Sequence, residues 1–391
     1  MLDRVSGATI MAAIAATTVG ALISVSVTGT SAQAPPQLKT PWGEPDLQGI
    51  WTDEFDTPLQ RPAKYATQEF FTEAQRAELD KARSEVLGRF ASERDINGAY
   101  NAATFFSTKH TGPRTSKIVD PSNGRMPPLT PQAQKTAATE REFRLALLQS
   151  TDTCKKMLPG CAGGKFEPTT SPRRAEASPR YNTGRLNRDD GPEDSSLAVR
   201  CLTGGLPEFG GATGSFRRIV QTPGGISMFY DVGQGQGWQR NIVMDGSPHL
   251  PPDIRQWFGD SRGRWEGNTL VIDVTNFSRK TDYQGSRENL HLIERWTRTG
   301  PKTLAYEVTI EDPTVWTQPW TVKQEFAKQS DEENRLYTEP RCLEGNFGLP
   351  GLLHGRRAED VAFAEGRGPD PASRDNTGAL IDAEVPQDPL Q

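Results

Sequence analysis

The sequence predicts a mainly β protein (α+β), in which an antiparallel barrel follows an amino-terminal helical and extended wrap. Runs rich in β-forming residues succeed one another in the second half and are separated by turn signals, such as Pro-Gly-Gly at 223–225. In one run, Leu304, Tyr306, Val308 and Ile310 alternate with polar or small residues, which is the period of a strand with one buried face. No stretch alternates strands with helices, which argues against a doubly wound α/β fold.

Seven strands are expected in this second half. They span residues 216–221, 226–231, 238–244, 269–274, 290–297, 303–310 and 320–327. Seven or more strands in meander order favour a sheet that is closed, or nearly closed, into a barrel.

Composition limits the size of the core. Of 391 residues only 34% are hydrophobic, and Gly 37 and Pro 30 indicate much loop or tail. The 45 basic and 50 acidic residues give a net charge of −5 without long single-sign blocks, which argues against a nucleic-acid partner. One barrel domain is therefore predicted, rather than the two or three domains that length alone would suggest.

The first 34 residues are predicted to be a signal peptide. Arg4 supplies a positive charge, residues 8–27 are apolar or small, and an Ala-x-Ala cleavage site ends at Ala34. The alternative is an uncleaved membrane anchor. No later stretch approaches ~18 uninterrupted apolar residues, so cleavage leaves a periplasmic or extracellular chain without a membrane span. The sequence sets no oligomeric state.

Residues 35–215 are predicted to form the wrap. A helix is expected over 72–90, where Thr72 and Gln75 match a capping box, and a second one from Thr130 through Gln149 with Pro131 in its first turn. The segment 155–214 is dense in Gly, Pro and charge and is expected to form surface loops. The barrel is assigned to 216–355, and the polar, Pro-rich residues 356–391 to a disordered tail.

Export would make the four cysteines candidates for disulfides. Cys154 and Cys161 flank a short segment with a turn-forming Pro-Gly, so their sulfurs could meet. Cys201 and Cys342 would then pair with each other. The other two pairings of four cysteines remain open.

Residues 249–267 form the least ordinary segment, a connection rich in Trp, Arg, Pro and Gly. We expect it to lie over a barrel mouth, where loops supply ligand contacts. His249 and Asp260 would transfer protons there, and Trp257 and Trp265 would contact a ligand. In the alternative, the two tryptophans plug the barrel end while Asp260 and Arg264 make ion pairs.

The predicted strand 290–297 carries the second group of candidates. One face holds Leu290, Leu292, Glu294 and Trp296, and the other holds His291, Ile293, Arg295 and Thr297. Apolar surroundings would raise the pKa of Glu294 and suit it to acid or base catalysis, with His291 as a second such group and Arg295 as an anion stabiliser. Which face points inward stays open, as does a structural pairing of Glu294 with an arginine.

Two functions of different class follow. The first is an exported protein that binds a small apolar or aromatic molecule. Its ring contacts would be Trp257, Trp265, Trp296 and Tyr306. The second is a cofactor-independent lyase, isomerase or hydrolase in the same pocket. Its acid, base and anion-binding groups would be His249, Asp260, His291, Glu294 and Arg295. A structural role in the cell envelope is a third possibility.

No metal and no cofactor are predicted. The four histidines include neither His-x-x-x-His nor His-x-His, so a metal site would need distant segments. The glycines at 233–237 join two predicted strands without a helix that could hold a phosphate, and they are expected to form a hairpin tip.

The chain resembles a widespread family of uncharacterised exported bacterial proteins. The resemblance rests on Pro-Trp-Gly-Glu-Pro-Asp-Leu-Gln-Gly-Ile-Trp at 41–51 and on residues 121–130, 249–267, 276–277, 285–295 and 342–346. It implies a calycin-type or lipocalin-type barrel in the second half and assigns no activity. Members often carry histidine after the last cysteine, where this chain has Leu343, so the resemblance gives no support for a metal ligand there.

Overall fold

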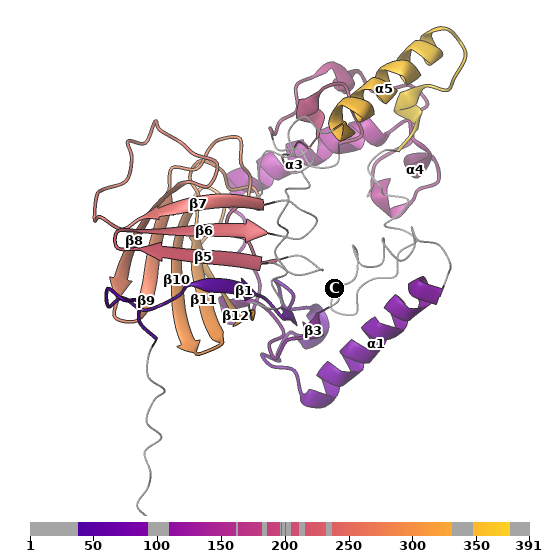
Figure 1. The fold of residues 1–391 in the computed structure, drawn as a ribbon. Coiled ribbons are helices and arrows are strands. Elements are labelled where there is room, and N and C mark those ends of the chain that lie inside the picture. Colours follow the sequence, from indigo (N-terminus) through magenta and orange to yellow (C-terminus); the bar gives the residue numbers. More distant parts are fainter. Residues whose placement is uncertain are drawn as a thin grey trace, which may run out of the picture. The chain divides into compact units, whose positions relative to one another are not determined.

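A closed barrel of nine strands is the centre of the fold (Figure 1). The computed structural model describes residues 38–92, 109–161, 163–181, 186–195, 197, 200, 205–210, 216–231, 237–330 and 347–375. Neighbouring strands follow the order β1-β5-β6-β7-β8-β9-β10-β11-β12, and pairing of β1 with β12 closes the ring. The mainly β fold class and the barrel predicted from the sequence are confirmed.

The barrel strands are β1 (Gly49–Thr52), β5 (Phe216–Thr222), β6 (Gly225–Asp231), β7 (Gly237–Val243), β8 (Asp260–Glu266), β9 (Thr269–Thr275), β10 (His291–Gly300), β11 (Thr303–Glu311) and β12 (Trp320–Lys328). β4 (Ile118–Asp120) adds to β12, while β2 (Phe55–Asp56) and β3 (His110–Thr111) form a separate parallel pair. Helices are α1 (Glu73–Ser92), α3 (Pro131–Leu148), α4 (Asp152–Lys155) and α5 (Gly348–Ala364). Single 3-10 turns are η1 (Ala63–Tyr65), η2 (Pro159–Cys161), η3 (Pro172–Ala175), η4 (Pro192–Asp194) and η5 (Pro371–Ser373).

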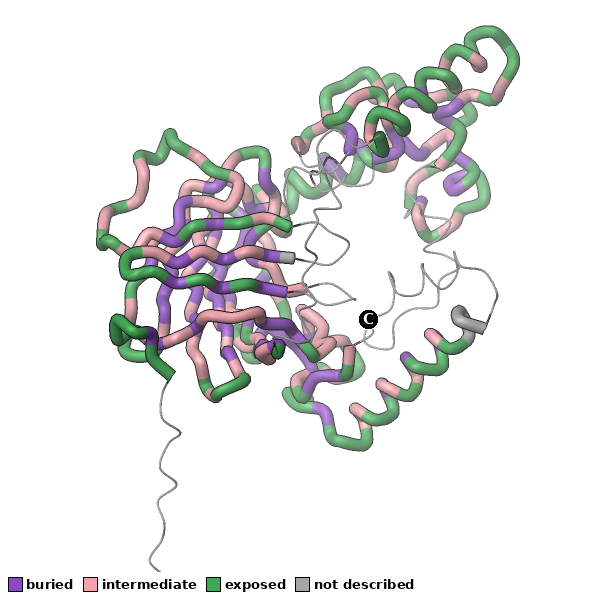
Figure 2. The backbone as a smooth tube through the Cα atoms, in the orientation of Figure 1, coloured by how far each residue is buried: buried purple, intermediate pink, exposed green. Residues whose placement is uncertain are grey.

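Alternation of side chains along the strands separates the barrel core from its outside (Figure 2). In β11, Leu304, Tyr306, Val308 and Ile310 are buried and the residues between them are half-buried, as the sequence predicts. In β10, Leu292, Glu294 and Trp296 point inward. The question of which face of this strand is internal is thereby decided in favour of Glu294.

One predicted loop proves to contain a strand. The sequence predicted a single connection over 249–267, but Asp260–Glu266 forms β8, which pairs along its length with β9. Alternation is hard to recognise there because the inward positions hold Ser261, Gly263 and Trp265 instead of aliphatic residues. β7 and β8 meet in a short parallel pairing, so residues 244–259 return along the barrel between them.

The amino-terminal wrap also contributes to the barrel, which the predicted boundary at 216 did not include. β1 closes the ring, and Trp51 and Leu47 are fully buried in the core. Gly49 has φ +134°, and a Cβ atom there would lie 2.7 Å from Cε of Lys328. The positive φ favours glycine at this position, which gives a structural reason for the second glycine of the 41–51 motif.

Both predicted helices of the wrap are confirmed. Thr72 and Gln75 exchange the two hydrogen bonds of a capping box before α1, and the Thr130 hydroxyl accepts from the backbone of Ala133 at the start of α3. The predicted disordered tail is wrong for residues 356–364, because they belong to α5. Ion pairs of Arg356 with Glu359 and Asp360 help to stabilise this helix.

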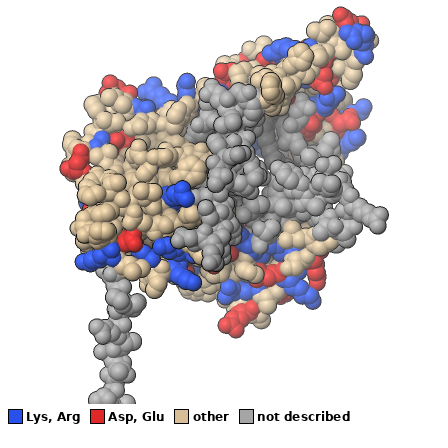
Figure 3. Space-filling view, in the orientation of Figure 1, with Lys and Arg blue, Asp and Glu red and all other residues tan. Residues whose placement is uncertain are grey.

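Cys154 and Cys161 form a disulfide, as predicted. Cys201 and Cys342, the predicted signal peptide 1–34 and the tail after 375 lie outside the described residues. No described helix has the length and apolar character needed to cross a membrane. Lys and Arg intermingle with Asp and Glu on the part of the chain visible in Figure 3, without a large patch of one sign among the described residues of that face.

Candidate functional site

A buried polar cluster lies inside the barrel on β7, β10 and β11. The Arg240 guanidinium donates from Nη2 to Glu294 Oε2, and the Tyr306 hydroxyl donates to Glu294 Oε1 over 2.8 Å. All three residues are at most 4% exposed. We call Arg240, Glu294 and Tyr306 the interior cluster. Glu294 is thus an ion-pair partner, as in the structural alternative that the sequence left open.

Aromatic rings surround the interior cluster. Trp296 lies 4.2 Å from Tyr306 between ring centroids, and Phe326 packs near both rings. The Tyr230 ring lies 5.7 Å from the Arg240 guanidinium and stacks on Trp238. A polar cluster bounded by flat rings is the type of lining that small-molecule sites use for orientation and apolar contact.

A second buried ion pair adjoins the cluster. Arg217 is fully buried, pairs with Glu208, and places its guanidinium over the rings of Tyr230, Trp296 and Phe326. The two arginines are each matched by one carboxylate. The charges of these four side chains therefore cancel inside the barrel.

Several buried donors of this interior lack a hydrogen-bond acceptor among the described residues. They are Nε and Nη1 of Arg240 and the indole Nε1 atoms of Trp238 and Trp296. Buried polar groups in folded proteins nearly always have a partner, which can be an ordered water or a ligand. The interior therefore presents an excess of donors.

Burial also fixes the protonation of the interior tyrosines. Loss of solvation raises the pKa of Tyr230 to about 12, and the same cause, together with the Glu294 charge, raises the pKa of Tyr306 well above its ordinary value. For Arg240, desolvation acts to lower the pKa, but the attraction of Glu294 outweighs it and raises the pKa. Near neutral pH the phenols stay protonated and Arg240 stays charged.

The remaining acid-base candidates meet on the outside of the barrel. His249 lies 2.8 Å from Asp260 through Nδ1 and 3.2 Å from Asp273 Oδ1 through Nε2. His291 lies 3.0 Å from the same Asp273 oxygen and 3.1 Å from Glu311. These five residues alternate carboxylate and imidazole, and we call them the outer row.

The outer row engages both ring nitrogens of both histidines. Hydrogen bonding to Asp273 raises the pKa of His291 despite its partial burial, and the same bond lowers the pKa of Asp273. Burial acts to raise the pKa of Asp260, but hydrogen bonds from Arg262 and His249 outweigh it and lower the pKa. Because both ring nitrogens of each histidine already face carboxylate oxygens, this arrangement suits a structural contact better than a base that accepts a proton from a substrate.

The single acid-base pocket expected from the sequence is therefore divided by the sheet. His249, Asp260 and His291 come together outside, whereas Glu294 points inside. Arg295 also points outward, where it pairs with Glu266.

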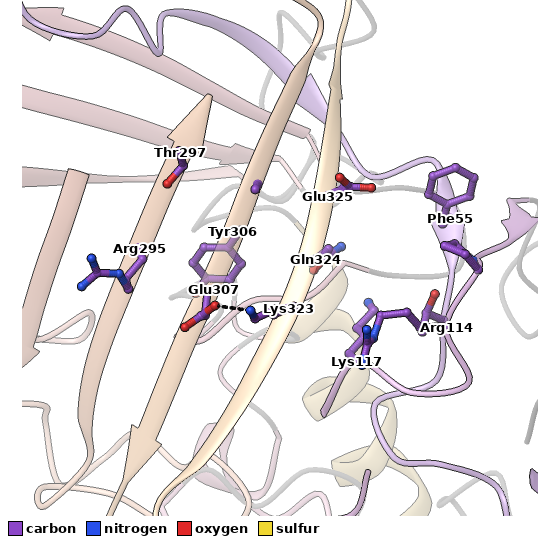
Figure 4. Close-up of a pocket in the computed structure, with 13 residues that line it drawn as sticks. Phe55, Arg114, Lys117, Arg295, Thr297, Tyr306, Glu307, Lys323, Gln324 and Glu325 are labelled. Carbon is purple, nitrogen blue, oxygen red and sulfur yellow. Dashed lines mark ion pairs between the residues drawn. The ribbon is translucent and has the colours of Figure 1, made fainter. Parts of the chain in front are cut away.

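A pocket of about 330 Å³ lies against the outward residues of β10, β11 and β12 (Figure 4). Arg295, Glu307 and Lys323 form one side, and Phe55, Arg114 and Lys117 stand across from them. Lys323 pairs with Glu307 over 2.8 Å, so charge is largely compensated on the strand side. Desolvation lowers the pKa of Lys117 to about 8, while its Nζ donates to the Phe209 carbonyl over 2.7 Å. This pocket was not predicted from the sequence, because it joins strands to segments far away along the chain.

The four predicted ring contacts have different positions. Trp296 and Tyr306 are in the core, and Trp265 is half-buried against it. Trp257 is half-buried but does not pack against that core. Its neighbour Phe258 does, and it stacks on Trp238 with 5.7 Å between ring centroids.

Arg240, Arg217 and Asp273 were not predicted as site residues. The first two were recognisable as charged residues in register with the apolar positions of a strand, Arg240 with Ile242 and Arg217 with Ile219. Asp273 offered no comparable signal, since a polar residue on the outer face of a strand is ordinary. Among the described residues, no three His, Cys, Asp or Glu side chains are placed to hold a metal ion.

Comparison with known proteins finds similarity to solved structures at low sequence identity. No model of a known protein family matches the chain, and no curated protein matches it. A crystal structure of a mutant of the fluorescent protein UnaG has 16% identity and a TM-score of 0.21, over 32% of this chain and 79% of that one. A secretary abundant heat soluble protein from Ramazzottius varieornatus has 13% identity and a TM-score of 0.17, over 34% and 82%. Identities and TM-scores this low give no basis for assigning a function.

Proposed function

We propose that this protein is an exported barrel that binds a small apolar or aromatic molecule in its interior. The observation that carries the proposal is the set of buried donors at the interior cluster that lack acceptors among the described residues. A core that served packing alone would gain nothing from them, because an unsatisfied buried donor costs about 1–3 kcal/mol. A bound molecule that accepts these hydrogen bonds removes that cost.

The ring arrangement supports the same proposal. Trp296, Tyr306, Tyr230 and Phe326 lie beside the donors, so one molecule bound there would contact rings and polar atoms together. Such a combination gives apolar affinity and a fixed orientation.

Export rests on sequence features and on one structural feature. The predicted signal peptide and the family resemblance point to an exported protein. The Cys154–Cys161 disulfide supports this, since disulfides persist mainly in oxidising compartments.

The alternative, a cofactor-independent enzyme, receives less support. Its predicted acid and base groups lie on both sides of the sheet, and the ring nitrogens of His249 and His291 are all within 3.2 Å of carboxylate oxygens. A general base needs a free position toward its substrate.

Mass spectrometry of co-purifying molecules tests binding. The full chain is produced with its export signal, purified from the exported fraction and denatured to release small molecules. We expect one species in near-stoichiometric amount, at least tenfold less of it from Trp296→Leu, and no change in Arg264→Gln, an exposed residue on β8. Circular dichroism checks that the variants fold. A wild-type protein that releases nothing and binds no aromatic dye would refute the proposal.

A further inference from the structure

We infer that the molecule held in the barrel is uncharged and flat and carries a carbonyl-type acceptor oxygen directed at Arg240. This inference rests on the proposed function and specifies its ligand class. It follows from three properties of the interior: the kind of polar atom left without a partner, the balance of charge and the shape of the walls.

The first property is the excess of donors. Within the described part of the chain, Arg240 Nε and Nη1 and Trp296 Nε1 are buried and lack acceptors. Gln324 Oε1 is an acceptor without a donor in this part of the chain, and it lies on β12, across from Tyr306. A ligand that presents acceptors satisfies this interior, whereas a pure hydrocarbon leaves the donors unsatisfied.

The second property is charge compensation. Glu294 already neutralises Arg240, and Glu208 pairs with Arg217. A ligand carboxylate beside Arg240 would add an unmatched negative charge to Glu294 in a desolvated space, and repulsion between the two carboxylates would weaken binding. A neutral carbonyl accepts the same hydrogen bonds without that cost.

The third property is the geometry of the rings. Tyr230, Trp238 and Phe258 form a continuous stack with interplanar angles of 6° and 7°, and it begins beside Arg240. Trp296 and Phe326 are inclined by 26°. These rings already contact one another, so a planar guest would add to the end of a stack, where offset stacking maximises contact between flat surfaces.

Three probes of one skeleton separate these properties: fluorene without an acceptor, fluoren-9-one with one neutral carbonyl, and fluorene-9-carboxylate with a charge. Quenching of tryptophan fluorescence and calorimetry give the dissociation constants with the full chain. We expect fluoren-9-one to bind at least tenfold more tightly than either of the others. Arg240→Lys keeps the charge opposite Glu294 but removes Nε and Nη1, so it should reduce the advantage of the ketone over fluorene to under threefold.

Two further variants complete the test. Trp296→Phe removes the indole donor while keeping an aromatic ring, and it should weaken ketone binding several-fold with little effect on fluorene. Arg264→Lys, on the outer face of β8, should change nothing. Thermal unfolding confirms that each variant is folded.

The failures of the two proposals can be told apart. Fluorene binding as tightly as the ketone, carboxylate binding most tightly, or a ketone preference that survives Arg240→Lys would overturn the ligand class and leave a small-molecule barrel in place. The ligand class is likewise overturned if the co-purifying molecule is a hydrocarbon or an anion. Absence of any bound probe together with absence of a co-purifying molecule would overturn both proposals.

Discussion

Tyr306 donates its phenol hydrogen to Glu294 across two neighbouring strands over 2.8 Å, so the carboxylate has one oxygen for the phenol and the other for Arg240. The arrangement places a carboxylate and a guanidinium in the barrel interior without an unmatched charge. It also ties β7, β10 and β11 together through one side chain.

Glu294→Gln should destabilise the fold strongly, because it leaves the Arg240 charge buried without a partner. We expect the free energy of unfolding to fall by about 3–5 kcal/mol, against about 1–2 kcal/mol for Tyr306→Phe. Urea unfolding measures both. Glu325→Gln on the outer side of β12 is the matched control, and the double variant Arg240→Met/Glu294→Leu should recover much of the loss. Equal costs for Glu294→Gln and Glu325→Gln would contradict the role of the ion pair.

The outer row should make stability depend on pH. The folded pKa of His291 is raised above 6.5. Its contribution to the stability of the folded state is therefore complete below that value and is lost as pH rises through the folded pKa. The pKa of Asp273 is lowered from 3.8, so its contribution is present above that value and is lost as pH falls through the folded pKa. Stability from this pair is therefore greatest between about pH 4 and pH 6.5.

Denaturant unfolding at pH 6 and pH 9 measures this effect. Since solvent reaches about a third of both side chains, we expect a loss of ~1 kcal/mol or less at the higher pH. In His291→Gln, most of the difference in unfolding free energy between the two pH values should disappear. His354→Gln, at an exposed position of α5, should retain it. An identical pH response in the two variants would show that the outer row has no part in it.

Phe258, rather than Trp257, should stabilise the end of the barrel against unfolding. Phe258→Ala removes the ring stacked on Trp238 and should cost about 2–3 kcal/mol, below the roughly 3–5 kcal/mol for a fully buried aromatic residue, because the ring is only partly buried. Trp257→Ala should cost well under half of that, although it deletes the larger side chain. Thermal unfolding of the two neighbours makes a direct comparison. The reverse order would place Trp257, and not Phe258, among the contacts that hold this end of the barrel.

If the protein is exported, the purified chain should have a cleaved amino terminus and two disulfide bonds. Amino-terminal sequencing should begin at Pro35, and a non-reducing peptide map should show the 154–161 link together with one between Cys201 and Cys342. Free thiols at 201 and 342, or a chain that starts at Met1, would contradict the predicted oxidising destination and the predicted cleavage, respectively.

Local patterns were sufficient for much of this fold. The alternation in β11, the capping box of α1 and the Thr130-Pro131 start of α3 depend on neighbouring residues only, and all were predicted from the sequence. β8 and α5 were missed because their stability depends on partners. β8 is a glycine-containing strand held by β9, and α5 is a helix whose Glu359 and Arg357 contact Arg374 and the Asp190 carbonyl outside it.

The sequence by itself determined that one strand face would hold Glu294 with Leu292 and Trp296, and the opposite face His291 with Arg295. This follows from the two-residue period of a strand, which is a property of the backbone. The tertiary structure alone decided which face is internal, that Arg240 from another strand meets Glu294, and that Asp273 joins the two histidines outside. Closure of the sheet brings these distant residues together, and the separation of inside from outside places the ion pair and the imidazoles in different environments.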